Sequence, residues 1–251
     1  MSLPFLSVVT VTKNDYTGLT RTIESLISLQ KFQIELIIVD ASDDNLIDYF
    51  ICYPLSGFQN LKIISEPDEG VYYGMNKGLQ NATGSYVWFL NGGDLNLLSS
   101  IDFINEYAAG SNTPVLLGDY KLRSKNFRAS RKAARISKIR HGLPTSHQAI
   151  LYPREVFQSI MFRTDFKICA DYASLADLCV IGSEIQYVDE YFAEFQLDGI
   201  SGKNQKVLRA EARLIQRDIL GVGWVSIIFS SWRHLLTARI RKSVQRLSGL
   251  K

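Results

Sequence analysis

The stretch from Glu66 to Asp94, EPDEGVYYGMNKGLQNATGSYVWFLNGGD, constrains the fold of this chain more than any other part. Its Pro, Asp and Gly residues predict a turn at the start. Val71 to Gln80 then has the spacing of a short helix, with apolar residues four apart on one face. Tyr86 to Leu90 is a short apolar run typical of a buried strand. Because open α/β sheets bind ligands at the carboxyl ends of their strands, the loop that follows predicts a ligand site at Asp94.

Strand and helix patterns alternate before this stretch. Leu6 to Thr12 and Ile34 to Val39 are apolar, β-branched runs, and Leu61 to Ser65 is a third short one. Thr17 to Ser28 has amphipathic helical spacing, with Thr17 as the expected N-cap. Strand, helix and strand with short connections imply parallel pairing and right-handed crossovers. We therefore expect an α/β fold with a mostly parallel sheet flanked by helices.

Length and composition favour one large domain. A chain of 251 residues with 46% hydrophobic content can bury one sizeable core. Since no run of roughly 18 apolar residues is present, we expect no transmembrane helix. Met1 to Val11 lacks the basic start of a signal peptide, so we expect no leader. The 3 cysteines show no metal-ligand spacing and are expected to be reduced thiols.

The net charge of +3 hides a segregation along the chain. Residues 1–120 carry a net charge of −9 and residues 141–202 carry −6, whereas residues 121–140 and 203–251 carry +9 each. An acidic body with two basic segments suggests two anionic contacts, such as a phosphorylated ligand and an anionic membrane surface. Solvated loops and tails have the same composition and are the alternative.

Residues 66–94 resemble a segment of family 2 glycosyltransferases of the GT-A fold, especially bacterial enzymes of exopolysaccharide and lipopolysaccharide (colanic-acid-type) synthesis. The pattern there is E-P-D-x-G-I-Y-D-A-M-N-K-G…A-T-G…F-L-N-x-G-D. The matching residues here are Glu66, Pro67, Asp68, Gly70, Tyr72, Met75, Asn76, Lys77, Gly78, Ala82, Thr83, Gly84, Phe89, Leu90, Asn91, Gly93 and Asp94. Gly74 stands where the pattern has Ala. Asn91 and Gly93 replace part of the general Asp-x-Asp metal motif, which leaves Asp94 as its carboxylate.

The resemblance implies a GT-A domain over residues 1–202 and a site for a nucleoside diphosphate sugar at its strand ends. Asp94 is the expected ligand of Mg²⁺ or Mn²⁺, which prefer oxygen ligands and would offset charge on the departing nucleotide. A plain turn aspartate is the alternative. Asp40 is expected beside the base or ribose, because a carboxylate accepts hydrogen bonds from ribose hydroxyls; helix capping is the alternative for Asp40 and Asp43. The other expected donor-binding residues are Thr12, Asn14, Asp68, Asn76, Lys77, Asn91, His147 and Gln148.

The first basic segment, Asp119 to Arg140, is expected to form a hairpin or mobile loop that closes over phosphates, which guanidinium groups bind in a bidentate manner. A solvated flap is the alternative. Its arginines are Arg123, Arg128, Arg131, Arg135 and Arg140. Aromatic residues are scarce and no nucleic-acid-binding module is recognisable, so we expect no nucleic acid partner.

Two further segments resemble the same group. The run HGLPTSHQA is similar to its M-P-x-x-H-Q-A segment, which places His147 by the diphosphate or the acceptor; a packed structural histidine is the alternative. Phe166 to Leu178 is similar to its x-x-A-x-D-Y-x-L segment, whose aspartate takes the proton from the attacking hydroxyl. Asp171 is therefore the expected general base, with an N-cap as the alternative. Leu197 to Gly202 resembles the family's G-G-x-S turn, with Asp198 in place of the first Gly.

Residues 203–251 are expected to form a basic, amphipathic helical extension. Val207 to Leu220 predicts one helix, and Trp224 to Leu250 a second with Trp and Leu on one face. Basic residues beside Trp and Leu fit an interfacial membrane anchor. Packing against the catalytic domain or a second subunit is the alternative.

The resemblance implies an inverting, metal-dependent glycosyltransferase that uses a nucleotide sugar, and together with the basic C-terminal segment it implies a glycan or lipid-linked acceptor. We expect it in the cytoplasm, peripheral on the inner face of the cytoplasmic membrane. One alternative is a catalytically inactive member that binds nucleotide sugars or glycans. Another is a dinucleotide-dependent oxidoreductase, although no G-x-G-x-x-G follows the first strand.

Overall fold

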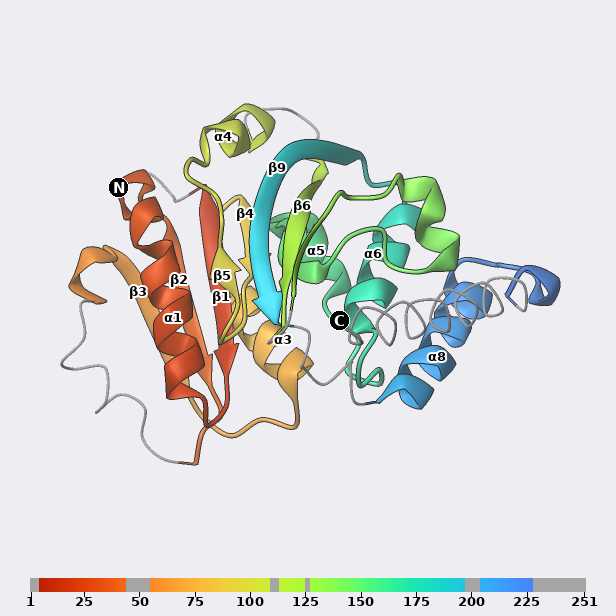
Figure 1. Ribbon diagram of the computed structural model, residues 1–251, viewed down its shortest axis with the longest axis horizontal. Helices are drawn as coiled ribbons and strands as arrows, with labels where there is room; N and C mark the ends of the chain where they lie inside the picture. Colours follow the sequence, from red (N-terminus) through yellow and green to blue (C-terminus); the bar gives the residue numbers. More distant parts are fainter. Residues whose placement is uncertain (1–4, 44–54, 109–112, 125–126, 197–203, 228–251) are drawn as a thin grey trace, which may run out of the picture.

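The computed structural model describes residues 5–43, 55–108, 113–124, 127–196 and 204–227. Within them one nine-stranded sheet has the order β3-β2-β1-β4-β8-β6-β9-β5, and β7 pairs with β6 (Figure 1). The strands are β1 Leu6–Thr12, β2 Glu35–Asp40, β3 Asn60–Ser65, β4 Tyr86–Phe89, β5 Leu95–Asn96, β6 Val115–Arg123, β7 Arg128–Arg131, β8 Ile150–Pro153 and β9 Ile185–Gln196.

The first half of the sheet follows the expected pattern. β1 is central and pairs in parallel with β2 and β4, and β2 pairs in parallel with β3. Every residue of β1 is buried, as a strand covered on both faces requires. The helix α1, Tyr16–Leu26, begins one residue earlier than expected, and its N-cap is Asp15 rather than Thr17, because Asp15 Oδ1 accepts from the Gly18 N–H at 2.8 Å.

The second half of the sheet is mixed. β8 is antiparallel to both β4 and β6, whereas β9 runs parallel to β6 and antiparallel to β5. β9 is one continuous strand of 12 residues. The expected α/β architecture is therefore confirmed, with parallel pairing concentrated in residues 6–89.

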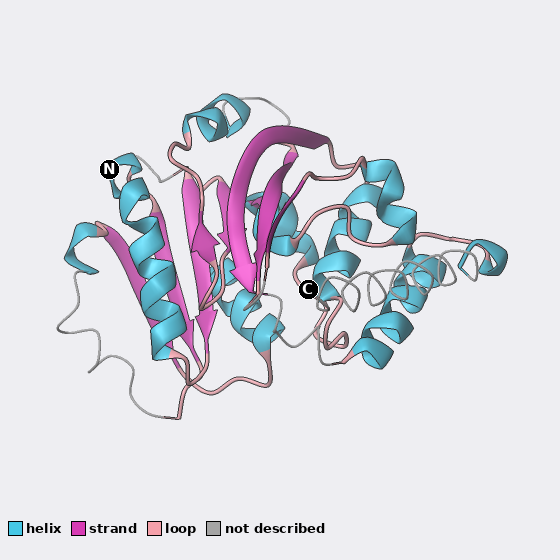
Figure 2. Ribbon diagram, in the orientation of Figure 1, coloured by secondary structure: helices cyan, strands magenta, loops and turns pink. Residues whose placement is uncertain are grey.

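Helices cover both faces of the sheet (Figure 2). One core cluster lies between the sheet and α3 (Val71–Asn81), α5 (Arg154–Ile160) and α6 (Ala170–Val180). The other lies between the sheet and α1 and α4 (Asp102–Ala108). Alternate residues of β1 enter the two clusters, as the period of a strand dictates.

Gly78 allows α3 to lie close to the sheet. A Cβ at Gly78 would come within 2.2 Å of Val9 Cγ1 on β1, so a larger residue would push the helix outward. Tyr72, Met75 and Leu79 are buried on the same face of α3, which confirms the helical spacing seen in the sequence. This close packing fixes α3 against β1 and the neighbouring β2.

The first basic segment forms a hairpin rather than an isolated loop. β7 pairs with the end of β6, and a 3₁₀ helix follows at Ile136–His141. Lys132 forms ion pairs with Asp119, at 2.7 Å, and with Asp189. The hairpin is thereby joined to β9.

The described part of the C-terminal extension packs against the sheet domain. The expected basic helix is α8, Gln205–Leu214, continued by a π-helix at Ile215–Ile219. Ile215 is fully buried in the cluster under α6. The expected second helix begins among the described residues, since residues 224–227 are helical, whereas residues 228–251 and residues 197–203, with the expected turn containing Asp198, lie outside them. Within the described ranges no helix is long and apolar enough to cross a membrane.

Candidate active site

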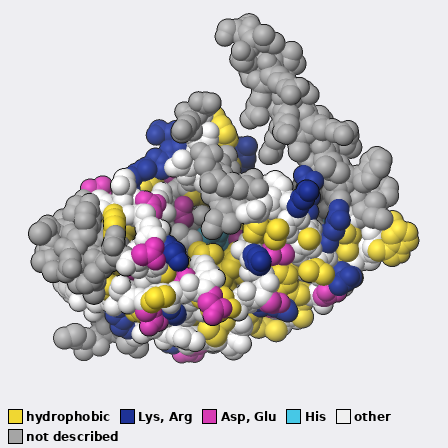
Figure 3. Space-filling model, turned by 90° about the horizontal axis from the view of Figure 1, so that it is seen from below, with side chains coloured by type: hydrophobic (Ala, Val, Ile, Leu, Met, Phe, Trp, Pro, Cys, Tyr) yellow, Lys and Arg dark blue, Asp and Glu magenta, His cyan; other side chains and the backbone are white. Residues whose placement is uncertain are grey.

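The loop from Asn91 to Asp94 follows β4 at the end of the sheet where the parallel strands finish, the face seen in Figure 3. The Thr22 hydroxyl of α1 forms hydrogen bonds with this loop. Its Oγ accepts from the Gly93 N–H at 3.0 Å and lies 2.7 Å from the Asp94 carbonyl oxygen. Gly93 has φ 95°, in the left-handed region that favours glycine. The loop therefore has a defined shape before any ligand binds.

The Asp94 carboxyl is buried. Loss of hydration raises its pKa to about 6, although His147, Gln148, the Asn91 N–H and Arg123 counteract part of the rise. Gln148 Nε2 donates to Asp94 Oδ2 at 3.1 Å, and the Asn91 N–H donates to the same oxygen at 3.2 Å. A buried carboxylate whose loss of hydration is only partly offset by its neighbours attracts a cation.

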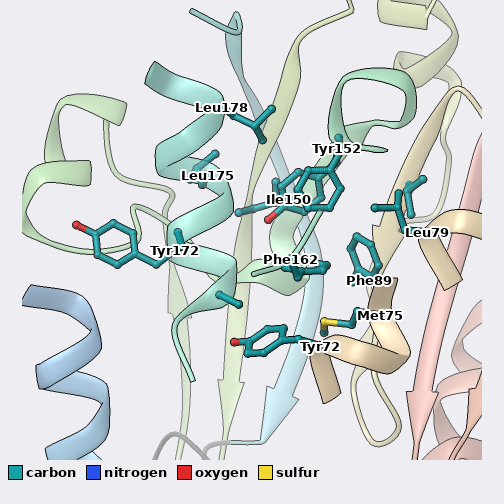
Figure 4. Packing of buried hydrophobic residues seen from close by; sticks show 14 of the residues in the cluster. Tyr72, Met75, Leu79, Phe89, Ile150, Tyr152, Phe162, Tyr172, Leu175 and Leu178 are labelled. Atoms are coloured by element: carbon teal, nitrogen blue, oxygen red, sulfur yellow. The ribbon is translucent and has the colours of Figure 1, made fainter. Parts of the chain in front are cut away.

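Asp171 lies in the first turn of α6, where the helix dipole favours a carboxylate. Its Oδ2 lies 3.5 Å from His147 Nδ1, and its Oδ1 lies 3.5 Å from the Tyr72 hydroxyl. That hydroxyl donates to the Ile168 carbonyl oxygen at 2.6 Å. Burial and the Asp171 charge raise the pKa of Tyr72 well above its ordinary value, so the phenol stays neutral. Figure 4 shows Tyr72 reaching from α3 toward the start of α6.

One short turn connects the two carboxylates. The 3₁₀ turn His147–Ala149 directs His147 to Asp171 and the next residue, Gln148, to Asp94. Trp88 Nε1 donates to the Gln148 carbonyl oxygen at 2.8 Å inside the core and fixes the turn on β4. His147 Nε2 is buried and has no hydrogen-bond partner within the described ranges. The structure thus brings Asp94, Gln148, His147 and Asp171 into one constellation.

The residues expected at the base or ribose lie at the ends of β1 and β2. Asp40 is fully buried, and its Oδ1 accepts from the Ser42 N–H at 3.0 Å and from the Ser42 hydroxyl at 2.5 Å. Asn14, with φ 53°, exchanges two hydrogen bonds with Asp43: Asn14 Nδ2 to Asp43 Oδ2 at 2.9 Å and the Asp43 N–H to Asn14 Oδ1 at 3.1 Å. These polar groups form hydrogen bonds within the protein and thereby fix the loops that follow β1 and β2.

Three residues predicted to bind the donor have partners within the protein. Asn76 Nδ2 donates to the Phe162 carbonyl oxygen and Asn76 Oδ1 accepts from the Phe162 N–H, both at 2.8 Å. Lys77 Nζ lies 2.9 Å from Glu66 Oε1. Asp68 Oδ1 accepts from the Gly70 N–H at 3.0 Å. These contacts give Asn76 and Lys77 structural roles around α3 and make Asp68 part of the turn that precedes it.

Thr12 and Asn91 lie beside the Asp94 loop. Thr12 is buried at the end of β1, and the Gly92 N–H donates to the preceding Val11 carbonyl oxygen at 3.0 Å. A Cβ at Gly92 would lie 3.2 Å from Thr12 Oγ1, so the loop contacts this hydroxyl closely. Asn91 Oδ1 is buried and has no hydrogen-bond partner in the part of the chain that the structure describes. An unsatisfied buried oxygen of this kind is a fitting acceptor for a cation or a ligand hydroxyl.

Comparison with known proteins identifies the family. Residues 7–159 match the Glycosyl transferase family 2 model, which is more than half of the chain. The chain belongs to glycosyl transferase family 2. The match covers β1 to α5 and so includes the Asp94 loop and the turn at His147, whereas α6 with Asp171 lies beyond it.

Two mycobacterial proteins are similar to this family 2 member. A PGL/p-HBAD biosynthesis glycosyltransferase of Mycobacterium tuberculosis is 30% identical over 178 residues, which are 68% of each protein. An uncharacterized glycosyltransferase of M. tuberculosis is 40% identical over 97 residues, 37% of this chain and 35% of that protein. The alignment with the latter thus spans about a third of its length.

Solved structures confirm the GT-A fold. S. aureus TarS residues 1–349 in complex with UDP has a TM-score of 0.63 at 21% identity, over 86% of this chain and 70% of that one. A mannosyltransferase from Pyrobaculum calidifontis in complex with GDP-Man and Mn²⁺ has a TM-score of 0.62 at 14% identity, over 86% and 64%. At these identities the likeness concerns the fold alone.

The ligands available around Asp94 fit a divalent cation whose coordination is completed by substrate phosphates. Within the described ranges no group of three His, Cys, Asp or Glu residues could enclose a metal ion. Mg²⁺ is usually bound in proteins through one or two carboxylates, with water and substrate phosphates as the remaining ligands. Asp94 supplies one carboxylate, and Asn91 adds the unsatisfied Oδ1. This set is sufficient for a cation completed by a diphosphate.

Arg123, one of the five arginines in the segment expected to close over phosphates, acts on the Asp94 carboxyl. It ends β6, and its charge lowers the pKa of Asp94. Its Nε lies 3.3 Å from Glu194 Oε1, while Nη2 is buried with no hydrogen-bond partner among the described residues. The basic segment was recognisable in the sequence, but pairing with β9 decides which of its arginines faces the site. A guanidinium whose charge acts on Asp94 and whose Nη2 has no partner within the described ranges suits a phosphate.

Proposed function

We propose that this family 2 glycosyltransferase moves a sugar from a nucleoside diphosphate sugar to an acceptor hydroxyl with inversion at the anomeric carbon. One observation carries the proposal: adjacent residues of one turn, His147 and Gln148, contact Asp171 and Asp94. A donor held at Asp94 and an acceptor held at Asp171 would therefore meet across this turn.

Asp171 acts as the general base in the proposed reaction. Its carboxylate takes the proton of the acceptor hydroxyl while the hydroxyl oxygen forms a bond to the anomeric carbon of the donor. The bond between that carbon and the diphosphate oxygen breaks, its electron pair goes to the oxygen, and the nucleoside diphosphate leaves. His147, 3.5 Å from Asp171 Oδ2, orients the carboxylate. Holding both reactants in line supplies much of the acceleration.

The diphosphate would be bound by Asp94, Asn91 and Arg123. Mg²⁺ or Mn²⁺ held by Asp94 would neutralise charge on the leaving diphosphate, and the Mn²⁺ in the P. calidifontis complex supports a divalent ion. The Arg123 guanidinium would add hydrogen bonds to the phosphate oxygens. Thr12, Asn14 and Asp40 line the neighbouring strand ends, where the nucleoside is expected.

The acceptor is proposed to be a glycan or lipid-linked glycan of a bacterial cell envelope. The similar mycobacterial protein named as a PGL/p-HBAD biosynthesis glycosyltransferase supports a biosynthetic role. The UDP and UDP-GlcNAc complexes of TarS, and the GDP-Man complex of the mannosyltransferase, support UDP- or GDP-sugars as donors.

The C-terminal extension is proposed to bind the anionic inner surface of the cytoplasmic membrane. Residues 203–251 carry a net charge of +9, and the Trp224 side chain is 73% exposed. Hydrophobic side chains lie beside Lys and Arg side chains on the right of the face in Figure 3. Exposed Trp beside basic residues suits the headgroup region of a bilayer.

The function is tested by a donor screen followed by an assay of turnover. UDP-, GDP- and dTDP-sugars are added with and without Mn²⁺, and a bound donor raises the unfolding midpoint by mass action. The preferred donor is then incubated with lipid-linked and soluble glycan acceptors, and the released nucleoside diphosphate is measured. We expect one nucleotide to bind and to be turned over. Binding without turnover on any acceptor would instead support the inactive-binder alternative.

A further inference from the structure

Glu211 on α8 is bound to the backbone that leads into α6. Its Oε1 accepts from the Lys167 N–H at 2.8 Å, and its Oε2 accepts from the N–H groups of Ile168 and Cys169, both at 2.9 Å. The carboxyl is buried, whereas Lys206, Arg209 and Arg213 on the same helix are exposed. Three successive backbone N–H groups thus donate to one buried carboxylate, which makes this a specific contact between α8 and the segment before α6.

The contact supplies an acceptor and a negative charge at the start of α6. Cys169 is the N-cap residue of α6, and its side chain does not cap the helix. The N–H groups at the start of a helix need acceptors, and a negative charge is favoured there. Glu211, 42 residues further along the chain, places a carboxylate at this helix start and accepts from the Cys169 N–H, while its other two donors, Lys167 and Ile168, lie just before the helix.

Asp171 follows this segment by two residues, so its backbone position depends on the same contacts. The segment is fixed from two sides: Glu211 accepts from its N–H groups, and the Tyr72 hydroxyl donates to the Ile168 carbonyl oxygen. Residues 167–169 are thereby attached both to α8 and to α3.

We propose that Glu211 is a positioning residue for catalysis, which makes α8 part of the machinery that places Asp171. The inference rests on the proposed function, because Asp171 is the proposed base. α8 lies beyond the family match at residues 7–159, so this contact extends the active unit past the common domain. Glu211 acts through the backbone of residues 167–169.

The test uses the full chain with Glu211→Gln, which keeps the size of the side chain but replaces one acceptor oxygen with a donor. We expect kcat to fall on the order of 10-fold to 100-fold, since a small displacement of a catalytic group has effects of this size. The donor Kd is expected to stay within about 2-fold, because the Asp94 loop is untouched. Hydrogen exchange of the amides at residues 167–171 is expected to accelerate, while exchange at β1 and β4 stays unchanged.

Glu190→Gln, at an exposed glutamate of β9, is the matched control and is expected to leave kcat and exchange unchanged. A folded Glu211→Gln protein with wild-type kcat would overturn the proposal. A parallel loss of kcat and donor affinity would also overturn it, since that pattern indicates general destabilisation.

Glu211→Asp, which keeps the charge on a shorter side chain, is measured in the same way if the Gln variant does not fold. If the wild-type protein transfers no sugar, the proposed function fails, and the exchange rates alone then decide whether Glu211 holds the segment. Unchanged exchange at residues 167–171 would in that case overturn the positioning role.

Discussion

Gln148 Nε2 donates to Asp94 Oδ2 at 3.1 Å, while the adjacent His147 Nδ1 lies 3.5 Å from Asp171 Oδ2. Two carboxylates from distant parts of the chain, one after β4 and one at the start of α6, are thus linked through consecutive residues. The carboxylates differ in surroundings: burial raises the pKa of Asp94 to about 6, whereas Asp171 lies in a first helical turn. In the proposed reaction they have separate tasks: Asp94 binds the cation, and Asp171 accepts the proton.

Asp171→Asn is expected to abolish transfer and to leave donor binding unchanged. The amide cannot accept the proton of the acceptor hydroxyl, and loss of a general base costs roughly 10²–10⁴-fold in rate. The rate is measured as nucleoside diphosphate release, and binding as the shift of the unfolding midpoint. Asp165→Asn, at an exposed position before α6, is the control. Normal turnover in the Asp171 variant would refute its assignment as the base.

Asp94→Asn is expected to stabilise the metal-free protein above pH 6. Because burial raises the pKa of Asp94 from 3.8 to about 6, the folded state binds more protons than the unfolded state between those values. The free energy of unfolding therefore falls as pH rises through this window, and Asn removes the loss, which is at most about 3 kcal/mol.

Denaturant unfolding without metal at pH 4 and pH 7.5 measures the effect. The free energy of unfolding of the variant should exceed that of the wild type at pH 7.5 but not at pH 4. The variant should also lose Mn²⁺-dependent donor binding. In the wild type, Mn²⁺ should bind more tightly as pH rises through 6, because the metal requires the ionised carboxylate. Equal Mn²⁺ affinity at pH 5 and pH 7.5 would contradict Asp94 as the metal ligand.

Sequence patterns predicted local elements better than long-range partners. The strands and helices of residues 6–89 followed from periodicity, since each is defined by its own residues. The mixed pairing of β8, β6 and β9 did not, because strand direction depends on contacts between distant segments.

The same division holds within the site. Asp94, His147, Gln148 and Asp171 could be proposed from local motifs, and the structure brings them together. Asn76 belongs to the same motif, yet its amide binds the backbone of Phe162, 86 residues away. A single sequence cannot distinguish a polar residue that meets a ligand from one that meets a distant backbone.

Asn76→Ala is expected to destabilise the protein while leaving donor affinity near its wild-type value. The substitution leaves the N–H and carbonyl groups of Phe162 without partners, at a cost of about 1–3 kcal/mol for each buried group. Denaturant unfolding gives the stability, and calorimetry at 15 °C gives the UDP affinity of the folded protein. Asn81→Ala, at an exposed amide at the end of α3, is the control. Unchanged stability with weaker UDP binding would restore Asn76 as a donor ligand.

Arg123→Met is expected to weaken UDP binding by roughly 10-fold to 100-fold, the size of one or two hydrogen bonds from a charged group. Arg128→Met is the matched control, because Arg128 lies in the same hairpin but is exposed. Glu194→Gln separates the loss of the ion pair with Arg123 from the loss of the phosphate contact. If Arg123→Met and Arg128→Met bind UDP equally well, Arg123 does not contact the diphosphate.

Removal of residues 224–251 is expected to abolish binding to anionic liposomes and to leave turnover of a soluble acceptor unchanged. The cut removes Trp224 and the basic residues beyond it but keeps α8, so Glu211 still binds the start of the helix that carries Asp171. Co-sedimentation with vesicles of anionic lipid measures the binding. Vesicles of neutral lipid are the control, and added salt should weaken the wild-type interaction because exposed charges are screened. Undiminished binding of the shortened chain would exclude the segment as the anchor, whereas a simultaneous loss of turnover would show that it also supports the active site.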